Sequence, residues 1–489
     1  MSKIEVDAID KQSGSTLTLG GSGTAVTLAS GATQTGFGRT GTVDWQTGSI
    51  KTATFTAVSG EGYFCNTAGG SFEVDLPAGV VGAIVSIQDY NNTFDSNSLA
   101  VDPNGSEKIN GGVAGEVVTL TTEGQGVTFV YIDATVGWRS VQDNQFSQSG
   151  QAPTFVCASV SGSGNTLATA PCCANAKIAT FTGPGNFTVN SISNTSTNNI
   201  VSYMVVAGGG GGGYEDAGGG GAGGFREVKS PTTPYTASPL DGYGTPANRI
   251  TVTAAAFPIV IGGGGAAGTP PAGSPAGFGE CGSVSTFSTI TSAGGGGGGA
   301  GECNANLGIR QGKPGGSGGG GAGVYAPQPQ DGSCGPSGGT GNTPPVSPPQ
   351  GNTGGNGPTL PRSANNVAEQ GGGGGGATQA GQRNPSPTTT GAGGAGGAGA
   401  TTSISATPTA YAGGGGGGIH TYPSPGPGSR SAGGTPTAGQ GGYPGPSSNE
   451  AGTNASNNSG GGGGGPGGNG GGAGGNGGSG IVIIRYKFQ

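Results

Sequence analysis

Acidic side chains are the first candidates for catalysis in the glycine-rich part of this chain, because two carboxylates on a rigid scaffold can cleave a glycosidic bond. Only Glu215 and Asp216 are adjacent, and successive side chains on an extended chain point apart. His420 is the sole histidine and the single candidate for a histidine-based triad, with a surface loop histidine as the plainer interpretation. The sequence predicts no enzyme, cofactor or metal site, and a polysaccharide depolymerase is the weaker alternative. The nine acids after residue 207 are Glu215, Asp216, Glu227, Asp241, Glu280, Glu302, Asp331, Glu369 and Glu450.

Arginine and tyrosine side chains between the glycine runs are better suited to binding than to catalysis. Both residue types are common anchors of recognition surfaces. Nearby prolines stiffen these segments and lower the entropy cost of ordering them on binding. For any single tyrosine, packing of the ring against the glycine runs is the alternative. The predicted contact residues are Arg310, Tyr325, Arg362, Arg383, Tyr411, His420, Tyr422, Arg430 and Tyr443.

Glycine runs must position these side chains. The chain has 489 residues, of which 119 are glycine and 33 are proline, a composition that usually indicates disorder. However, only 8% of the residues are charged and the net charge is −7, whereas disordered chains generally stay soluble through high charge. Glycine is concentrated after residue 200. Runs of six glycines occupy 208–213, 294–299, 371–376, 413–418 and 460–465.

Three physical interpretations of these runs compete. Flexible linkers are glycine-rich, but they are not usually interrupted by long segments that carry proline, tyrosine and arginine. Phosphate-binding loops need a Gly-Lys-Ser/Thr sequence, or a strand–loop–helix context with a downstream acid, and neither follows any run. The third interpretation, which we favour, is packed polyglycine II.

Polyglycine II is a left-handed threefold helix that rises about 3.1 Å per residue and has no internal hydrogen bonds. Without side chains, neighbouring helices approach closely and bond N–H to C=O between them, helped by Cα–H···O contacts. Alanine beside a run fits this packing, because one methyl group can point outward at the bundle edge. The sequence therefore predicts a polyglycine II bundle over residues 207–480 with display loops at its ends, and little or no α-helix anywhere.

The part of the chain before the glycine runs is predicted to be all-β. Residues 42–145 hold about eight short segments rich in β-branched and aromatic residues, separated by turn sequences such as "DPNG" and "EGQG". This pattern predicts a β-sandwich or jelly-roll domain. Phe72, Val74 and Leu76 are expected to alternate inward, as are Val127, Phe129 and Tyr131, and Trp138 is expected in the core.

Shorter segments complete the predicted organisation. Residues 1–41 contain the alternating repeats "STLTL" and "TAVTL" and are read as an attachment or stalk segment, with an arm lying on another protein as the alternative. Residues 146–206 form a bridge in which "AKIATFTGPGNFTVNSI" is read as a hairpin turning at "GPGN". The strand-like residues 481–489 close the chain, and we expect 481–486 to lie beside 200–206.

Composition also limits the possible partners. The mildly acidic chain has no basic stripe, so nucleic acid is not an expected partner. It has no long apolar run, so no membrane insertion is expected, and the start lacks the apolar stretch of a secretion signal. The seven cysteines have no metal-binding spacing and are read as mostly free thiols, although Cys172 and Cys173 could bridge elsewhere.

Several motifs together resemble a known family. "SYMVVAGGGGGG" after "FTGPGNFTV", the repeated "GGGGGG" blocks and the terminal "GGSGIVIIRY" resemble the glycine-rich receptor-binding domain of phage tail-fibre adhesins, best known from the long tail-fibre tips of T-even-like phages. The start, "IDKQSGSTLTLGGSGTAVTLASGATQTGFG", resembles the stalk of marine cyanophage tail fibres. In T-even-like phages, however, the adhesin is a separate protein that caps the fibre, whereas here stalk, β-domain and adhesin are fused.

The resemblance implies a structural virion protein that attaches to other tail proteins by its N-terminus and binds a host outer-membrane protein or surface glycan through the loops of its glycine-rich domain. It also implies a tail-fibre location after assembly in the host cytoplasm. A homotrimer is expected, because a short β-stalk must associate to bury its apolar face. The alternative from another class is a cellular glycine-rich surface or ice-binding protein.

Overall fold

A computed structural model describes residues 43–141, 154–171, 173–269, 277–301, 307–326, 336–361, 367–383, 392–422, 429–443, 450–468 and 472–489. The predicted stalk segment lies outside these residues. The chain divides between residues 152 and 153 into two compact units, which we call unit 1 and unit 2. Unit 1 holds the described residues 43–141, and unit 2 holds all the glycine runs.

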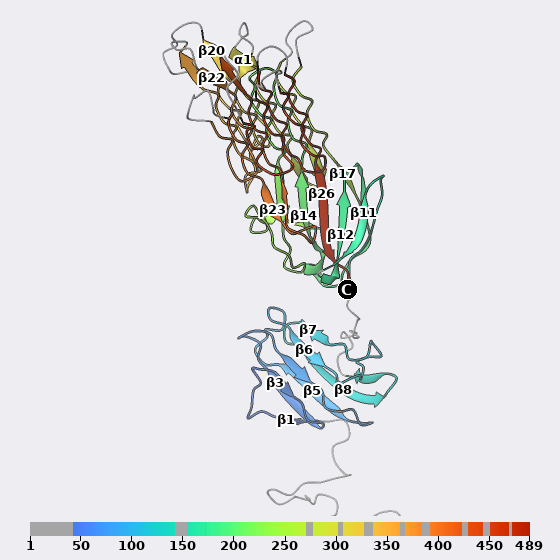
Figure 1. The fold of residues 1–489 in the computed structure, drawn as a ribbon. Helices are drawn as coiled ribbons and strands as arrows, with labels where there is room; N and C mark the ends of the chain where they lie inside the picture. The colour runs from blue at the N-terminus through green and yellow to red at the C-terminus, as the bar shows by residue number, and fades with distance from the viewer. Residues whose placement is uncertain are drawn as a thin grey trace, which may run out of the picture. The chain divides into compact units, whose positions relative to one another are not determined.

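Unit 1 consists of two β-sheets, and each of the predicted strand segments contains a strand. The first sheet has the order β1 (Asp44–Trp45), β3 (Glu61–Cys65), β5 (Ile84–Asp89), β8 (Gly126–Asp133) and β9 (Gly137–Ser140). The second sheet has the order β2 (Phe55–Thr56), β4 (Glu73–Asp75), β6 (Leu99–Asp102) and β7 (Val118–Leu120). Side chains from both sheets, including Val74, Leu99 and Phe129, form one core with the fully buried Trp138, which confirms the predicted β-sandwich (Figure 1).

The jelly-roll alternative for unit 1 is wrong, because a jelly roll is antiparallel. The chain crosses from one sheet to the other after each of its first strands, so successive strands of one sheet enter from the same side. Strands β1, β3 and β5 are therefore parallel, and so are β2, β4 and β6. Only the last strands, β7 and β8–β9, return antiparallel.

Unit 2 begins and ends with β-structure. One sheet has the order β11 (Thr166–Ala170), β12 (Cys173–Phe181), β26 (Ile481–Lys487), β14 (Ile200–Val206) and β15 (Phe225–Val228), with β16 (Ile250–Thr251) paired to β14. A second sheet has the order β10 (Cys157–Val160), β13 (Gly185–Ser191), β17 (Ala256–Val260), β18 (Ser285–Phe287) and β19 (Ile290–Ser292). Side chains of both sheets, among them Phe187, Tyr203 and Val482, share one core.

Strand β26 is central in the first of these sheets. It pairs antiparallel with β12 on one side and with β14 on the other, where Val206 lies opposite Ile481. The predicted juxtaposition of 200–206 and 481–486 is confirmed. The predicted hairpin at "GPGN" is wrong: β12 and β13 flank this turn but belong to different sheets. Phe181 and Phe187 on either side of the turn both enter the shared core, so the turn joins the two layers.

The remaining elements of unit 2 are short. Three two-stranded ribbons are β20 (Val324–Ala326) with β21 (Thr359–Pro361), β22 (Val367–Gln370) with β25 (Ile419–Tyr422), and β23 (Ala400–Thr402) with β24 (Thr409–Tyr411). The helices of the described residues are η1 (Ser196–Asn199), η2 (Pro246–Asn248) and α1 (Leu307–Arg310). None of them has the length and hydropathy of a membrane span. Within the part of the chain that the structure describes, the predicted scarcity of α-helix is confirmed, and so is the predicted β-structure of 43–141.

The glycine runs form neither α-helix nor β-strand, so the predicted polyglycine II helices are not among the regular elements of the fold. Their backbone groups are nevertheless paired. The N–H groups of 208–213 donate in rotation to three other segments, and each segment is reached again three residues later. The donor–acceptor pairs are Gly208–Ser283, Gly209–Gly478, Gly210–Gly221, Gly211–Glu280, Gly212–Gly475 and Gly213–Gly218.

The carbonyl groups of this run accept from three further segments with the same period. The acceptor–donor pairs are Gly208–Gly295, Gly211–Gly298, Gly209–Gly265, Gly212–Gly268 and Gly210–Gly463. The run therefore lies among other glycine-rich segments on all sides, and its buried backbone groups are satisfied without a hydrophobic core.

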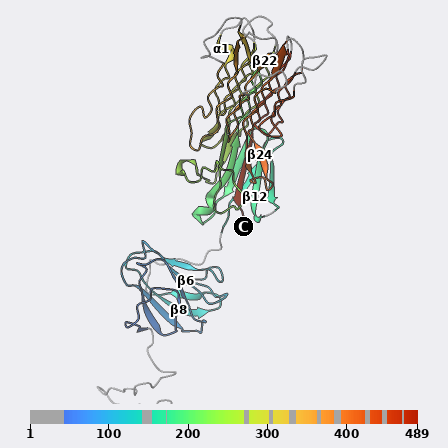
Figure 2. The ribbon, with the colours of Figure 1, turned by 60° about the vertical axis from the view of Figure 1, so that its left-hand side comes forward.

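Successive glycine-rich segments run alternately away from and back towards the sheets of unit 2. As Figures 1 and 2 show, β11, β12, β14 and β26 lie at one end of unit 2, and α1, β20 and β22 lie at the other. We call these the sheet end and the loop end of unit 2. The runs span the distance between them and hold the loop end away from the sheets.

Candidate functional site

The turn Tyr214–Ala217 joins the first two glycine runs at the loop end and contacts several other segments there. The N–H of Tyr214 donates to the carbonyl oxygen of Gly277 (2.6 Å), and the N–H of Gly301 donates to the carbonyl oxygen of Glu215 (2.9 Å). The N–H of Gly323 donates to the carbonyl oxygen of Asp216 (2.8 Å). Through these bonds, connections that are distant in sequence converge on one turn.

His420 of β25 packs against this turn. Its Nδ1 atom lies 3.6 Å from Oδ2 of Asp216, and both side chains are largely buried, at 12% and 6% exposed. Strand β25 is held beside β22, where Glu369 lies opposite His420 in the backbone register. The single histidine therefore contacts a buried carboxylate and is not a free surface residue, which the sequence alone did not predict.

Arg430 and Tyr443, two of the predicted contact residues, lie together near the loop end. The Arg430 guanidinium is 6.0 Å from the centre of the Tyr443 ring, and its Nη2 atom is 2.6 Å from Oε2 of Glu450. Its Nη1 atom donates to the carbonyl oxygen of Ala451 (3.3 Å). The arginine and tyrosine thus form a pre-organised pair whose positive charge is balanced by Glu450.

A second cation lies over an aromatic ring near the same end. Nζ of Lys313 is 3.2 Å from the centre of the Phe278 ring and 4.0 Å from Oε2 of Glu280. These three residues were not among the predicted contacts. Nothing in the sequence joins Phe278 to Lys313, because the pair is formed by two runs that become neighbours only in the folded unit.

The other predicted contact residues are placed as follows. Arg310 ends α1 and is half-buried, Tyr325 lies in β20, and Tyr422 ends β25, all at the loop end. Arg383 is exposed, and Arg362 lies outside the described residues. Tyr411 is at the sheet end, where it is 6% exposed in a core cluster with Met204 and Phe225. The Tyr411 ring is packed inside the unit, in line with the alternative that a single tyrosine packs and does not bind. We therefore leave Tyr411 out of the recognition surface.

Several acids of unit 2 have separate partners. Glu227 of β15 is buried at the sheet end, where Thr402 Oγ1 donates to Oε1 (2.5 Å) and the N–H of Ser238 donates to Oε2 (2.9 Å). Burial raises the pKa of Glu227 above its ordinary 4.5, although these hydrogen bonds oppose the shift. Asp216, Glu280 and Glu450 each face a basic side chain. Glu302 and Asp331 lie outside the described residues.

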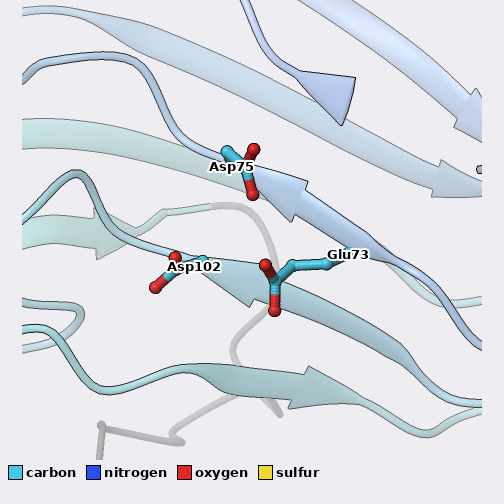
Figure 3. A group of neighbouring side chains, drawn as sticks. All are labelled: Glu73, Asp75 and Asp102. Atoms are coloured by element: carbon cyan, nitrogen blue, oxygen red, sulfur yellow. The ribbon is translucent and has the colours of Figure 1, made fainter. Parts of the chain in front are cut away.

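Among the described residues, three carboxylates gather in unit 1. Glu73 and Asp75 lie on the same face of β4, and Asp102 lies beside them on β6 (Figure 3). Carboxylate oxygens of all three lie within 4.8 Å of one another, and such oxygens are the donors that Ca²⁺ and Mg²⁺ prefer. Burial first, and then the charges of Asp102 and Asp75, raise the pKa of Glu73; burial and the charge of Asp75 raise the pKa of Asp102.

These shifts predict that neutralising one acid stabilises unit 1 at neutral pH. A carboxyl group whose pKa is raised by folding stabilises the folded state when it is protonated. This contribution is fully present at pH values below the ordinary pKa, which is 4.5 for Glu73 and 3.8 for Asp102. That contribution is lost as pH rises through the raised pKa. We expect Asp102→Asn to raise the melting temperature of unit 1 in the full-length protein at pH 7, by about 1–3 °C because the groups are partly solvated.

Calorimetry at several pH values tests this expectation. The advantage of the variant should shrink as the pH is lowered, because the wild-type carboxyls then become protonated. Glu123→Gln, which removes an exposed acid of unit 1, is the matched control and should show no such trend. A variant that melts at or below the wild-type temperature at every pH contradicts the prediction.

Taken together, the described residues define a protein with a two-sheet β unit and a glycine-rich unit whose segments carry polar and aromatic side chains to one end. A family model described as "Glycine-rich domain" matches residues 180–487, and the chain belongs to this family. The match spans unit 2 from within β12 to the last residue of β26. A search of curated proteins finds no match to the chain.

Proposed function

We propose that this protein is a phage tail-fibre adhesin that recognises a host cell through the loop end of unit 2. The observation that carries the proposal is the separation of the two ends: the glycine runs occupy the length of unit 2 between its sheets and the elements α1, β20 and β22 (Figure 1). The predicted contact residues Arg310, Tyr325 and Tyr422 belong to elements of the loop end. Binding residues are commonly placed on loops held by a rigid scaffold. Two motifs resemble those of tail-fibre adhesins: "VVAGGGGGG" is the end of β14 with its following run, and "GIVIIRY" is most of β26 with the glycine that precedes it.

In this proposal the glycine runs are polyglycine II helices packed side by side. Support comes from the backbone pairing of 208–213, in which donors and acceptors repeat every three residues, as a threefold helix requires. It also comes from the six different segments bonded to this one run, since a helix packed in a hexagonal array has neighbours on six sides. Such a lattice orders the loops before binding and so lowers the entropy cost of recognition.

The remaining parts of the proposal follow from the resemblance. The N-terminus attaches to other tail proteins, the protein forms a homotrimer in the tail fibre of the virion, and assembly takes place in the host cytoplasm. The partner at the loop end is an outer-membrane protein or a surface glycan of the host, bound reversibly and without chemical change. Among the acids of unit 2, Glu227 is buried at the sheet end. Asp216, Glu280 and Glu450 each face a basic side chain. These surroundings favour binding over glycan cleavage.

An adsorption measurement with the full-length protein tests this proposal. Fluorescently labelled wild type should bind saturably to at least one strain of a bacterial panel. We expect Arg430→Ala with Tyr443→Ala to weaken this binding about tenfold or more, because arginine and tyrosine anchors carry a large share of binding energy.

The control changes the same two residue types at the other end of unit 2. Arg249 lies over the Tyr243 ring at 4.3 Å, and its Nε donates to the Tyr243 carbonyl oxygen (2.9 Å). The variant with Arg249→Ala and Tyr243→Ala should bind as wild type does. Equal loss in both variants would argue against recognition at the loop end, and saturable binding to no strain would argue against an adhesin.

A further inference from the structure

The backbone of the turn Tyr214–Ala217 is unusual for the residues it contains. Glu215 and Asp216 have φ angles of +55° and +42°, in the left-handed region that glycine occupies without penalty. Two successive non-glycine residues in this region cost roughly 1–2 kcal/mol each. The chain has 119 glycines, yet this turn between two glycine runs keeps two acids at positions where glycine would be easier. Strain of this kind is commonly retained where a side chain has a role.

The side chain of Asp216 has a defined contact. Its carboxylate is 6% exposed and faces His420, with 3.6 Å between Oδ2 and Nδ1. This pair ties a side chain of the turn to strand β25 of the ribbon formed by β22 and β25. The backbone adds one link, because the N–H of Gly418 donates to the carbonyl oxygen of Ala217 (2.9 Å) just before β25 begins.

The same turn also fixes the ends of other runs. The N–H groups of Gly301 and Gly323 donate to its carbonyl oxygens, and its own Tyr214 N–H donates to Gly277. The turn is therefore attached to the inner glycine runs by backbone bonds, and the Asp216–His420 pair attaches it to the β22–β25 ribbon. A displacement of the ribbon relative to the runs must break the Asp216–His420 contact.

We propose that Asp216 is a positioning residue for recognition: through His420 it fixes the β22–β25 ribbon, which ends in the predicted contact residue Tyr422, against the glycine runs. This inference rests on the proposed function and deepens it by assigning a residue that does not itself touch the host. The carboxylate of Asp216 faces His420 from the turn, and Glu369 is the residue paired with His420 in the backbone register of β22 and β25. The contact is local, so its loss should loosen the ribbon and leave the lattice of runs intact.

Hydrogen exchange and adsorption of the full-length protein test the inference together. In Asp216→Asn we expect faster amide exchange in 367–370 and 419–422, unchanged exchange in 208–213, and a melting temperature within about 2 °C of wild type. Host binding should fall about tenfold, as for loss of an anchor. His420→Gln should have the same effect, and the double variant should be no worse than either single one, because the residues act as a pair.

Asp95→Asn, which removes an exposed acid of unit 1, is the control and should change neither readout. Unchanged exchange in the ribbon of Asp216→Asn overturns the inference, whatever happens to binding. If amide exchange rises throughout unit 2 in Asp216→Asn, the His420→Gln variant decides the question. The inference then requires that exchange in His420→Gln rises in the ribbon alone. If wild type binds no strain, the proposed function fails, while the exchange measurement still supports or overturns the positioning role.

Discussion

Replacing Gly212 with alanine is expected to destabilise unit 2 severely, although the substitution adds only one methyl group. Gly212 lies in the fully buried run 208–213, where its N–H donates to Gly475 (2.9 Å) and its carbonyl oxygen accepts from Gly268 (2.8 Å). A Cβ atom at Gly212 would collide with the carbonyl oxygen of Gly464. Because that oxygen belongs to a neighbouring backbone, the clash is relieved only by moving a whole run.

The cost should be at the upper end of that for overpacked cores, about 3 kcal/mol or more, because hydrogen bonds on two sides of the run weaken as it moves. Gly263 supplies the matched control: it is an exposed run residue, and a Cβ there meets no atom within 4 Å. Gly263→Ala should be neutral or stabilise by about 0.5 kcal/mol through reduced entropy of the unfolded chain. Chemical denaturation of both variants measures the difference in the free energy of unfolding, with the resistance of unit 2 to trypsin as the readout. Equal stability of the two variants would contradict close run-to-run packing.

The difference in burial between inner and outer glycine runs can be predicted in part from the sequence. The run 208–213 is uninterrupted glycine, and it is buried along its whole length. In 472–479, by contrast, side chains recur every third residue, at Ala473, Asn476 and Ser479, and these positions are exposed or half-exposed. Because the backbone bonds of the central run repeat every three residues, an outer run with the same period can carry a side chain at every third residue, on the side that faces solvent. A run of six glycines thus predicts burial, and a Gly-Gly-X spacing predicts an outer run.

Sequence could not predict which runs become neighbours. Glycine has no side chain that distinguishes one partner from another, so the pairing of Gly209 with Gly478 and of Gly210 with Gly221 leaves no trace in composition or spacing. The same limit applies to the site. Asp216 meets His420, and Lys313 meets Phe278, only because their runs end side by side. Residue types indicated the candidates Arg430 and Tyr443, but not the contact between them.

In unit 1 the limit is of a different kind. Alternation of apolar residues correctly predicted strands and their buried faces, for example Val74 and Leu76 in and beyond β4. It does not report the direction of a neighbouring strand, so the sequence left the antiparallel jelly roll open beside the β-sandwich, and the parallel pairing of β3 with β5 excludes it. The "GPGN" turn failed similarly, since a tight turn can join strands of two facing sheets as well as a hairpin.

Removal of residues 481–489 is expected to prevent unit 2 from folding. Strand β26 is bonded to β12 and β14 on its two sides, so its loss leaves both strands with open edges in the middle of a sheet. Its side chains serve two cores: Val482 and Ile484 enter the core between the sheets, and Ile483 enters the cluster on the other face. Each buried aliphatic side chain contributes about 1.5–3 kcal/mol, so their combined loss matches the 5–15 kcal/mol that stabilises a typical domain.

The same strand connects the sheets to the glycine lattice. The glycine-rich run before it ends at Gly480, whose N–H donates to the carbonyl oxygen of Gly262 (2.9 Å). In the same run, the carbonyl oxygen of Gly478 accepts from Gly209 of the central run (3.0 Å). A chain that stops at Gly480 should therefore lose amide protection in 208–213 as well as in β12 and β14. The unfolding transition of unit 1 should persist, because unit 1 has its own core.

Hydrogen exchange and calorimetry of the shortened chain check both parts of this expectation. Ile483→Val is the control for a mild change in the same strand and should cost only about 0.5–1.5 kcal/mol. A synthetic peptide of residues 481–489 added in excess should restore part of the protection, since the open edges of β12 and β14 present the hydrogen-bonding groups that β26 normally satisfies. If 208–213 stays protected without β26, the glycine runs hold together on their own pairing alone, and the sheets serve only to anchor them.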